Sequence, residues 1–323
     1  MISFIAQRIA KAIVVLLALV VLNFFLIRMA PGDPALVMAG EAGAGDQVFL
    51  AQLREKFGLD QPLPVQLFLY VKGILSLDLG FSFRQQMPVA TLILQRLPAT
   101  LLLTGTAFAI SLAFGILFGA LAARFAGTWA DTAITVAALI FYATPLFWVA
   151  LMAILLFSVA MDWLPSFGYE TVGANYTGFA HVLDVAAHLV LPATTIGLFF
   201  MATYARMTRA SMLAVLSSDF VRTARASGLK PITVIVAYAF RNALLPVITT
   251  LGMVFSFLLG ANVLVEKVFA WPGIGSFAVE ALIAADFAPV QGFVLTMAVL
   301  YVLLNLLIDV LYGWIDPRVR IEA

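Results

Sequence analysis

The residues able to do chemistry are few in this chain, and they form no catalytic arrangement. The chain has no cysteine, and its only histidines are His181 and His188. Histidines that share a metal on one helix usually lie about four residues apart, so a spacing of seven favours a structural role. The sequence contains no His-Glu-x-x-His, no Gly-x-Ser-x-Gly and no Gly-x-x-x-x-Gly-Lys-Ser/Thr motif. We therefore predict a non-enzymatic chain that binds no metal, cofactor or ATP itself.

One long basic segment stands out, residues 206–241, between two apolar stretches. The serine pair 217–218 can cap a helix, with Asp219 in the first turn, where an acidic side chain is favourable. Gly228 can end that helix in the left-handed conformation, and Pro231 suits the first turn of a second helix. Helices this short are marginal alone. We therefore expect a partner protein or the neighbouring membrane helices to provide the surface on which they pack.

The two faces of the first short helix differ in character. Helical spacing places Phe220 and Ala224 on one side with Val221 close by, and it places Arg222 and Arg225 on another side. A loop that only sets membrane topology would explain the arginines. It would not explain a helix, a glycine stop and a second helix.

The composition identifies the surroundings of this segment. The chain has 323 residues, of which 63% are hydrophobic and 11% charged, whereas soluble domains carry about 25% charged residues. This excludes an ordinary soluble globule, and the hydrophobicity excludes disorder. The formal net charge of +1 gives no general attraction to nucleic acid.

Six apolar stretches are long enough to cross a bilayer, since about 20 residues span its core. They are residues 9–29, 99–123, 132–161, 185–205, 242–265 and 287–308. The first exceeds the apolar part of a signal peptide, about 7–15 residues, and ends at Arg28 without a small-x-small site. Gly115 and Gly119 allow close helix approach, and Pro145 is expected to kink the third stretch. The fold class predicted is an all-α membrane protein with six spans.

Residues 31–97 differ from the spans, because charges of both signs are interspersed along them. Residues 47–57 have the periodicity of an amphipathic helix, which Gly58 would cap, and residues 64–75 form a second such pattern. We predict a small helical insertion outside the membrane, packed on the membrane face. The chain thus divides into residues 1–30, the insertion at 31–97, and a core of five spans at 98–323.

Lysine and arginine near the ends of the spans predict the orientation. With the N-terminus inside, the inner segments hold Arg8, Lys11, Arg124, Arg206, Arg209, Arg222, Arg225, Lys230, Arg241, Arg318 and Arg320. The two later outer loops hold Lys267 alone. Both termini and the basic segment are therefore expected on the cytoplasmic side.

Several ordered motifs run along nearly the whole chain. They are Arg28-x-x-Pro31-Gly32-Asp33-Pro34, Asp78-Leu79-Gly80-Phe81-Ser82, Arg96-Leu97-Pro98-Ala99-Thr100, Asp219-Phe220-Val221-Arg222-Thr223-Ala224-Arg225-Ala226-Ser227-Gly228-Leu229, Arg241-Asn242-Ala243-Leu244-Leu245-Pro246, Trp271-Pro272-Gly273, Gln291-Gly292, and Asp309 with Asp316-Pro317-Arg318-Val319-Arg320. Together they closely resemble the permease subunits of dipeptide and oligopeptide ABC importers. The resemblance implies a six-helix type I importer permease bundle, with an extracytoplasmic helical insertion after the first span, in the bacterial inner membrane.

The resemblance also implies a role for the basic segment, as the coupling segment that seats in a groove of a cytoplasmic ATPase. The residues concerned are Asp219, Phe220, Val221, Arg222, Ala224, Arg225, Ala226, Gly228 and Leu229. The broader importer signature is Glu-Ala-Ala, three residues and Gly; here only Ala224 and Gly228 match it. The partners implied are a homologous second permease, two ATPases that bind ATP and Mg²⁺, and a periplasmic or lipid-anchored substrate-binding protein.

The resemblance implies di- or oligopeptides as substrate, but the same family also handles glutathione, nickel complexes and other small solutes. Polar residues inside spans, Asn23, Ser256 and Asn262, are candidates to line the path, with ordinary interhelical hydrogen bonding as the alternative. A proton-coupled transporter is a second alternative, for which Asp309 is the one candidate relay residue. A structural assembly subunit is a third.

Overall fold

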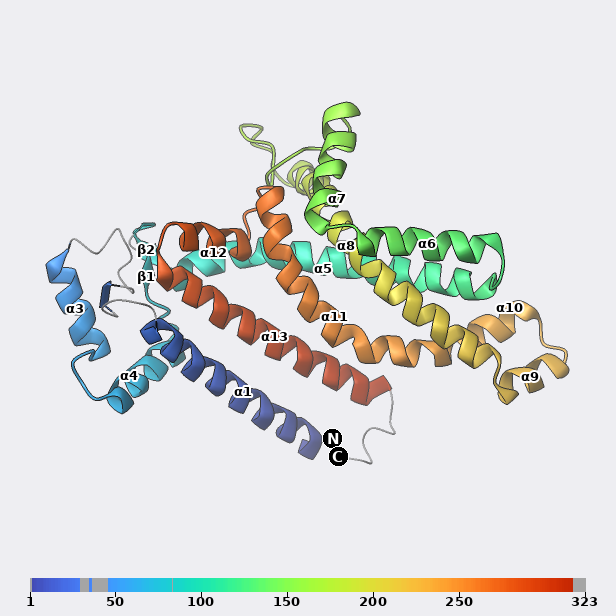
Figure 1. Cartoon of the computed structure of the whole chain (residues 1–323), viewed down its shortest axis with the longest axis horizontal. Coiled ribbons are helices and arrows are strands. Elements are labelled where there is room, and N and C mark those ends of the chain that lie inside the picture. The colour runs from blue at the N-terminus through green and yellow to red at the C-terminus, as the bar shows by residue number, and fades with distance from the viewer. Residues whose placement is uncertain (1, 30–34, 37–45, 83, 316–323) are drawn as a thin grey trace. The chain divides into compact units, whose positions relative to one another are not determined.

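The computed structural model describes residues 2–29, 35–36, 46–82 and 84–315. The chain forms two compact units, Met1–Thr100 with Pro272–Ala323 (unit 1) and Leu101–Trp271 (unit 2). Nearly all of the described secondary structure is helical (Figure 1). The predicted motif at residues 31–34 and the ending at residues 316–320, with Arg318 and Arg320, lie outside the described residues.

Unit 1 combines the two ends of the chain. Its elements are α1 (Ile2–Met29), α3 (Gln47–Phe57), α4 (Leu63–Leu75), the hairpin of β1 (Phe81–Ser82) and β2 (Met87–Pro88), the first turns of α5 (Val89–Arg124), α12 (Ile274–Ile283) and α13 (Phe287–Ile315). In the antiparallel hairpin Phe81 lies opposite Pro88. The helices α1 and α13 pack against one another, and α12 packs against α13.

Unit 2 contains the rest of α5 and a helical assembly around one central helix. Its further elements are α6 (Trp129–Ala143), α7 (Leu146–Ala153), the π-helix η1 (Ile154–Ala160), α8 (Phe179–Leu216), α9 (Asp219–Ala226), α10 (Pro231–Thr233), the π-helix η2 (Val234–Phe240) and α11 (Arg241–Val268). Helix α8 contacts α6, α7, η2, α9 and α11. Among the described spans, α8 is also the most buried, with 61% of the residues in its apolar stretch buried.

The two glycines singled out in the second span explain how α5 approaches α8. A Cβ atom added at Gly115 would lie 2.4 Å from the Cβ atom of Tyr204. One added at Gly119 would lie 2.5 Å from the carbonyl oxygen of Ala205. Only a residue without a side chain permits this separation, as predicted from the small residues.

The described residues contain five helices long and apolar enough to cross a membrane, or up to six if one bent pair counts as a single span. That pair is the predicted third span. It breaks at Thr144 and Pro145, so that Trp129–Ala143 and Leu146–Ala160 meet at 103°. The proline was expected to kink the helix; instead the chain extends at Pro145, with ψ of 131°, and starts a new helix.

Several helices begin or end at residues other than those expected from the sequence. The insertion was placed up to residue 97, but α5 already begins at Val89. The outer loop after the fifth span contains α12. At the start of that helix, the Ile274 N–H donates to the Thr100 hydroxyl, 174 residues away, at 2.9 Å. The fourth span was predicted to end at residue 205, but α8 continues to Leu216. The second helix predicted in the segment 206–241 runs on without a break from Pro231 to Val268.

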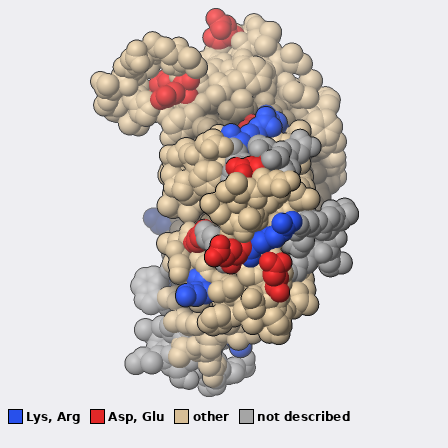
Figure 2. Space-filling view, turned by 90° about the vertical axis from the view of Figure 1, so that its left-hand side faces the viewer, with Lys and Arg blue, Asp and Glu red and all other residues tan. Residues whose placement is uncertain are grey.

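The helix predicted at residues 47–57 is confirmed as α3, with the same bounds. The Asp46 carboxylate accepts a hydrogen bond from the Phe49 N–H at 3.0 Å, and Gly58 ends the helix at φ +56°. On the face of the molecule shown in Figure 2, the described basic and acidic side chains are scattered among uncharged residues. That arrangement agrees with the small net charge.

Candidate functional site

The turn that connects α8 to the next long helix contains α9, Asp219–Ala226, as an isolated two-turn helix. Gly228 follows it with φ +77°, the left-handed conformation predicted from its type. Its N–H donates to the Arg225 carbonyl at 3.0 Å, and the Leu229 N–H donates to the Ala224 carbonyl at 3.4 Å. Pro231 then begins the second helix, as predicted.

The predicted serine cap is wrong in its chemistry, although Ser218 does occupy the N-cap position. Its hydroxyl donates backward to the Val215 carbonyl at 2.5 Å and makes no bond to the N–H groups of α9. Stabilisation of this helix start by a side chain therefore comes from Asp219 and not from Ser218, because a negative charge in the first turn is favourable. Its ion pair with Arg222, at 3.6 Å, is largely exposed and contributes little to stability.

The structure shows which face of α9 packs inward. Val221 and Ala224 are buried against Val234, with Val215 and Leu216 alongside. Phe220, predicted to share the side of Ala224, is 45% exposed. The neighbouring helices of this chain therefore supply the packing surface, and what α9 presents outward is Asp219, Phe220, Arg222, Arg225, Ala226, Gly228 and Leu229.

An ion pair fixes the last turns of α8 to the start of α6. The Arg209 Nε and Nη2 atoms each donate to the Asp131 carboxylate at 2.7 Å, and the Gly127 N–H donates to it at 3.1 Å. Sequence reasoning missed the pair: Arg209 was counted only as an inner charge. Opposite charges on two segments predicted to lie on the same side were the available signal.

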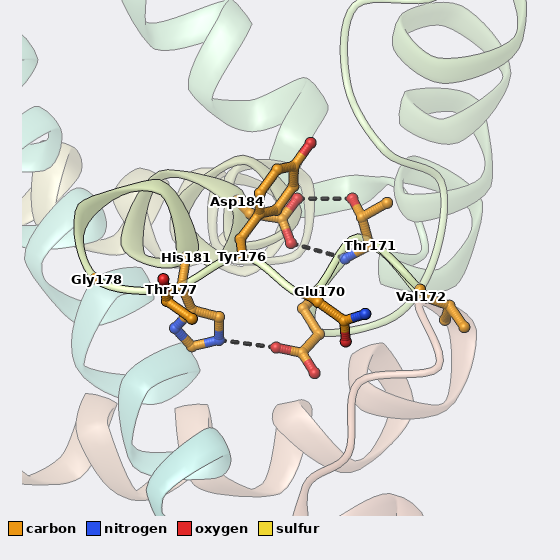
Figure 3. A pocket seen from close by; sticks show the side chains of 10 residues that line it. Glu170, Thr171, Val172, Tyr176, Thr177, Gly178, His181 and Asp184 are labelled. Carbon is orange, nitrogen blue, oxygen red and sulfur yellow. Dashed lines mark hydrogen bonds and ion pairs between the residues drawn. The ribbon is translucent and has the colours of Figure 1, made fainter.

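At its other end, α8 borders a pocket of about 530 Å³ (Figure 3). The His181 Nε2 atom lies 2.7 Å from the Glu170 carboxylate, and the Asp184 carboxylate accepts two hydrogen bonds of 2.7 Å from Thr171. The lining also includes Val172, Gly173, Asn175, Tyr176, Thr177 and Gly178. The lining formed by the described residues contains no Lys or Arg, so two carboxylates and one histidine set its electrostatics.

The loop that forms the pocket is fixed to the end of α11. The Gly168 N–H donates to the Phe269 carbonyl at 2.9 Å, and the rings of Tyr169 and Trp271 lie 4.9 Å apart. The two histidines have different partners: His181 lies against Glu170, whereas His188 bonds the Asp184 carbonyl one turn earlier in its own helix. Among the described residues, no group of three or more His, Asp or Glu side chains could hold a metal ion.

The structure does not bring the three candidate path-lining residues together. The Asn23 Nδ2 atom donates to the Tyr70 hydroxyl at 3.0 Å inside unit 1. Asn262 is fully buried inside unit 2, where it donates to Thr104. Ser256 bonds the Gly252 carbonyl of its own helix. Asn23 and Asn262 thus make hydrogen bonds between helices, and a path-lining role for the three residues stays a prediction. Asp309 lies in α13, and its side chain is outside the described structure.

The apolar helices and the helical turn between two long spans define a multi-pass membrane protein. Residues 115–321 match the family model of the binding-protein-dependent transport system inner membrane component, and residues 1–104 match the model of the N-terminal part of such membrane components. The chain belongs to this family of transport-system membrane components.

Similar proteins agree with this assignment. A putative peptide transport system permease protein of Brucella abortus (strain 2308) is 41% identical over 322 residues, which cover 100% of both chains. The dipeptide transport system permease protein DppB of Escherichia coli (strain K12) is 38% identical over 99% of both chains. An inward-facing structure of the MetNI methionine ABC transporter shares the fold, with a TM-score of 0.54 and 19% identity over 70% of this chain and 96% of that one.

Proposed function

We propose that this chain is a permease subunit of an ATP-driven ABC importer and forms, with a homologous second permease, the path for di- or oligopeptides. The single observation that carries the proposal is full-length similarity, at 38–41% identity, to proteins named as peptide or dipeptide permeases. Glutathione and nickel complexes are the competing substrates within the same class of transporter.

Helix α9 is the proposed contact with the ATPase. The sequence has no phosphate loop, so ATP and Mg²⁺ would be bound and ATP hydrolysed by partner subunits. The exposed side of α9 carries one apolar side chain, Phe220, with Asp219, Arg222 and Arg225 around it. A partner protein could bind the apolar ring and pair with these charges. Its buried side joins it to the ends of both long helices, so a movement of α9 would be passed to α8 and α11 as a rigid-body shift.

The proposed orientation follows from the positive-inside distribution, with α9 and both termini on the cytoplasmic side of the bacterial inner membrane. Helix α8 has 38 residues, which correspond to about 57 Å at 1.5 Å per residue. This length would connect α9 on one side to the acidic pocket on the other. We place the arrival of substrate from a binding protein on the pocket side.

Phe220→Arg tests the docking assignment in the assembled transporter, reconstituted in vesicles. The Phe220 side chain is 45% exposed, so this variant should fold. Ala224 is buried, so a substitution there would disturb folding as well as docking and is not used. We expect ATP-dependent uptake to fall at least severalfold, together with loss of the increase in ATP hydrolysis caused by loaded binding protein. Trp129→Arg, an 83% exposed aromatic residue on α6, is the matched control and should keep both activities.

Normal uptake and normal stimulated hydrolysis in Phe220→Arg would refute docking through α9.

The substrate class needs a separate measurement. The complex is purified with its binding protein, and the molecule that this protein holds is identified by mass spectrometry. A peptide supports the proposal, whereas glutathione or a metal complex would replace the substrate and leave the transporter class intact.

A further inference from the structure

Helix α4 of the insertion is apolar on two opposite faces. Its inner face buries Tyr70 in a cluster with Val20, Phe24 and Leu295. Its outer face carries Val65, Phe68 and Leu75, exposed at 42%, 67% and 77%. Together with Lys72 they follow helical spacing and form one stripe, which we call the outer stripe. A helix that is apolar on all sides is normally covered on all sides.

The contacts of the inner face fix the position of α4 along α1. The Tyr70 hydroxyl accepts a hydrogen bond from Asn23, and the Tyr70 ring lies 5.6 Å from the ring of Phe24. Both partners belong to the last turn of the apolar span Ala6–Leu26. At 1.5 Å per residue, Asn23 is only about 4–5 Å from the end of that span. Helix α4 therefore lies beside the end of α1 (Figure 1). The apolar stretch of α1 ends there, so this is the level at which the apolar core of a bilayer crossed by α1 would stop.

We propose that the outer stripe of α4 is embedded in the interfacial region of the bilayer, with lipid as its occupant. The exposed side chains of Leu22 and Phe25, at 55% and 46%, belong to the same end of α1, so the apolar surface of the span continues at the level of α4. A helix in this position buries its outward apolar side chains at the boundary between headgroups and acyl chains.

The charge of the segment fits the same occupant. Residues 61–77 contain no Asp or Glu and a single basic residue, Lys72. The alkyl stem of a lysine can lie along the apolar surface while its ammonium group reaches the lipid phosphates. Helix α3 differs, because three charged residues, Arg54, Glu55 and Lys56, follow one another in it. We expect α3 to face water.

The absence of cysteine from the sequence allows spin labels to be placed without background. Phe68→Cys and Leu75→Cys report the outer stripe, and Val48→Cys on α3 is the matched control, an apolar side chain that is 69% exposed. Each variant is labelled in the assembled transporter in lipid nanodiscs. Collision with oxygen, which concentrates in lipid, is compared with collision with a water-soluble nickel chelate. We expect the ratio of oxygen to nickel collisions to be severalfold higher at positions 68 and 75 than at position 48.

Two results would overturn the inference. Labels at positions 68 and 75 with the same ratio as position 48 would place the stripe in water. Labels immobilised and shielded from both reagents, or shielded only after the binding protein is added, would show that a protein covers it.

In a second arm, Lys72→Glu should lower the ratio at position 68 more strongly in phosphatidylglycerol than in phosphatidylcholine nanodiscs. Equal effects would exclude contact with anionic headgroups. The inference depends on α1 crossing the bilayer and not on the substrate, so uptake assays on the same variants test the proposed function separately.

Discussion

The pairing of Asp131 with Arg209 shows how a single side chain fixes the position of two helices. Both carboxylate oxygens of Asp131 are used, since Oδ1 accepts from Nε and Oδ2 accepts from Nη2, each at 2.7 Å. Only the planar guanidinium group can donate two parallel hydrogen bonds in this way. Arg209 lies seven residues, about two turns, before the end of α8 at Leu216. The pair therefore joins the end of α8 that leads to α9 to the start of the broken α6–α7 span.

Arg209→Lys removes one of the two parallel bonds and keeps the charge. We expect it to destabilise unit 2 by about 1–3 kcal/mol, less than for a fully buried pair because the arginine side chain is one-third exposed. Thermal unfolding of the purified transporter measures this loss. If the pair also transmits movement, the amount of peptide imported per ATP hydrolysed should fall in the same variant at a temperature where it remains folded.

The exposed pair of Asp219 and Arg222 provides the stability control. Its atoms are 3.6 Å apart and its side chains are 98% and 73% exposed, so Arg222→Lys should change stability by no more than about 0.5 kcal/mol. Equal unfolding temperatures for Arg209→Lys and the unmodified protein would mean that the bidentate geometry does not stabilise the α6–α8 contact.

At the scale of elements, the approach of α5 to α8 depends on two glycines. In Gly119→Ala the new methyl group would lie 2.5 Å from a backbone oxygen of α8 and 2.6 Å from the Thr208 Cβ atom, neither of which is the end of a flexible side chain. The two helices would have to separate, and overpacking of this kind costs about 1–3 kcal/mol. We expect a lower unfolding temperature for the purified transporter.

Gly105→Ala is the control in the same helix. No atom lies within 4 Å of its added Cβ, and alanine is favoured over glycine in a helix by up to about 1 kcal/mol. This variant should unfold at the same temperature as the unmodified protein or a higher one. The opposite order of the two variants would contradict the helix contact described above.

Local patterns in the sequence predicted the elements that local interactions determine. The amphipathic periodicity gave α3 with its bounds, and Gly228 and Pro231 marked the end of α9 and the start of the next helix. The hairpin and α12 were missed, since each is stabilised by residues far away in the chain, such as Thr100 for Ile274. The role of Ser218 was wrong because its hydroxyl had a second acceptor, the Val215 carbonyl, which the residue type alone does not reveal.

The candidate site was predictable to a similar extent. The position of α9 followed from residue types, but its buried face did not, because Val234 and Leu216 pack against Val221 from two other segments. The ion pair of Asp131 with Arg209 joins residues 78 apart, a separation that no helical or strand periodicity encodes. The pocket formed by Glu170, His181 and Asp184 depends likewise on how one loop folds back onto α8.

At the scale of the whole molecule, unit 1 is assembled from segments at opposite ends of the chain. The Ser82 hydroxyl at the hairpin donates to the Asp286 carboxylate at 2.5 Å, across 204 residues of sequence. Asp286 is buried at the turn between α12 and α13, and its second carboxylate oxygen has no hydrogen-bond partner among the described residues. This bond holds the segment before α5 against the segment before α13.

Burial raises the pKa of Asp286 above the ordinary value of 3.8, although the hydrogen bonds from Ser82 and the Arg84 backbone oppose the rise. The folded state therefore holds this proton more tightly than the unfolded chain. The stabilisation is complete below pH 3.8 and is lost as the pH rises through the higher pKa of the folded state.

We expect hydrogen exchange at residues 81–88, corrected for the intrinsic rate, to show more protection at mildly acidic than at neutral pH. Asp286→Asn should abolish this dependence because the amide still accepts from Ser82 and does not titrate, whereas Asp60→Asn, at an exposed position of the same unit, should keep it. Protection that is independent of pH in the unmodified protein, or a dependence that survives in Asp286→Asn, would show that this carboxyl group does not control the junction.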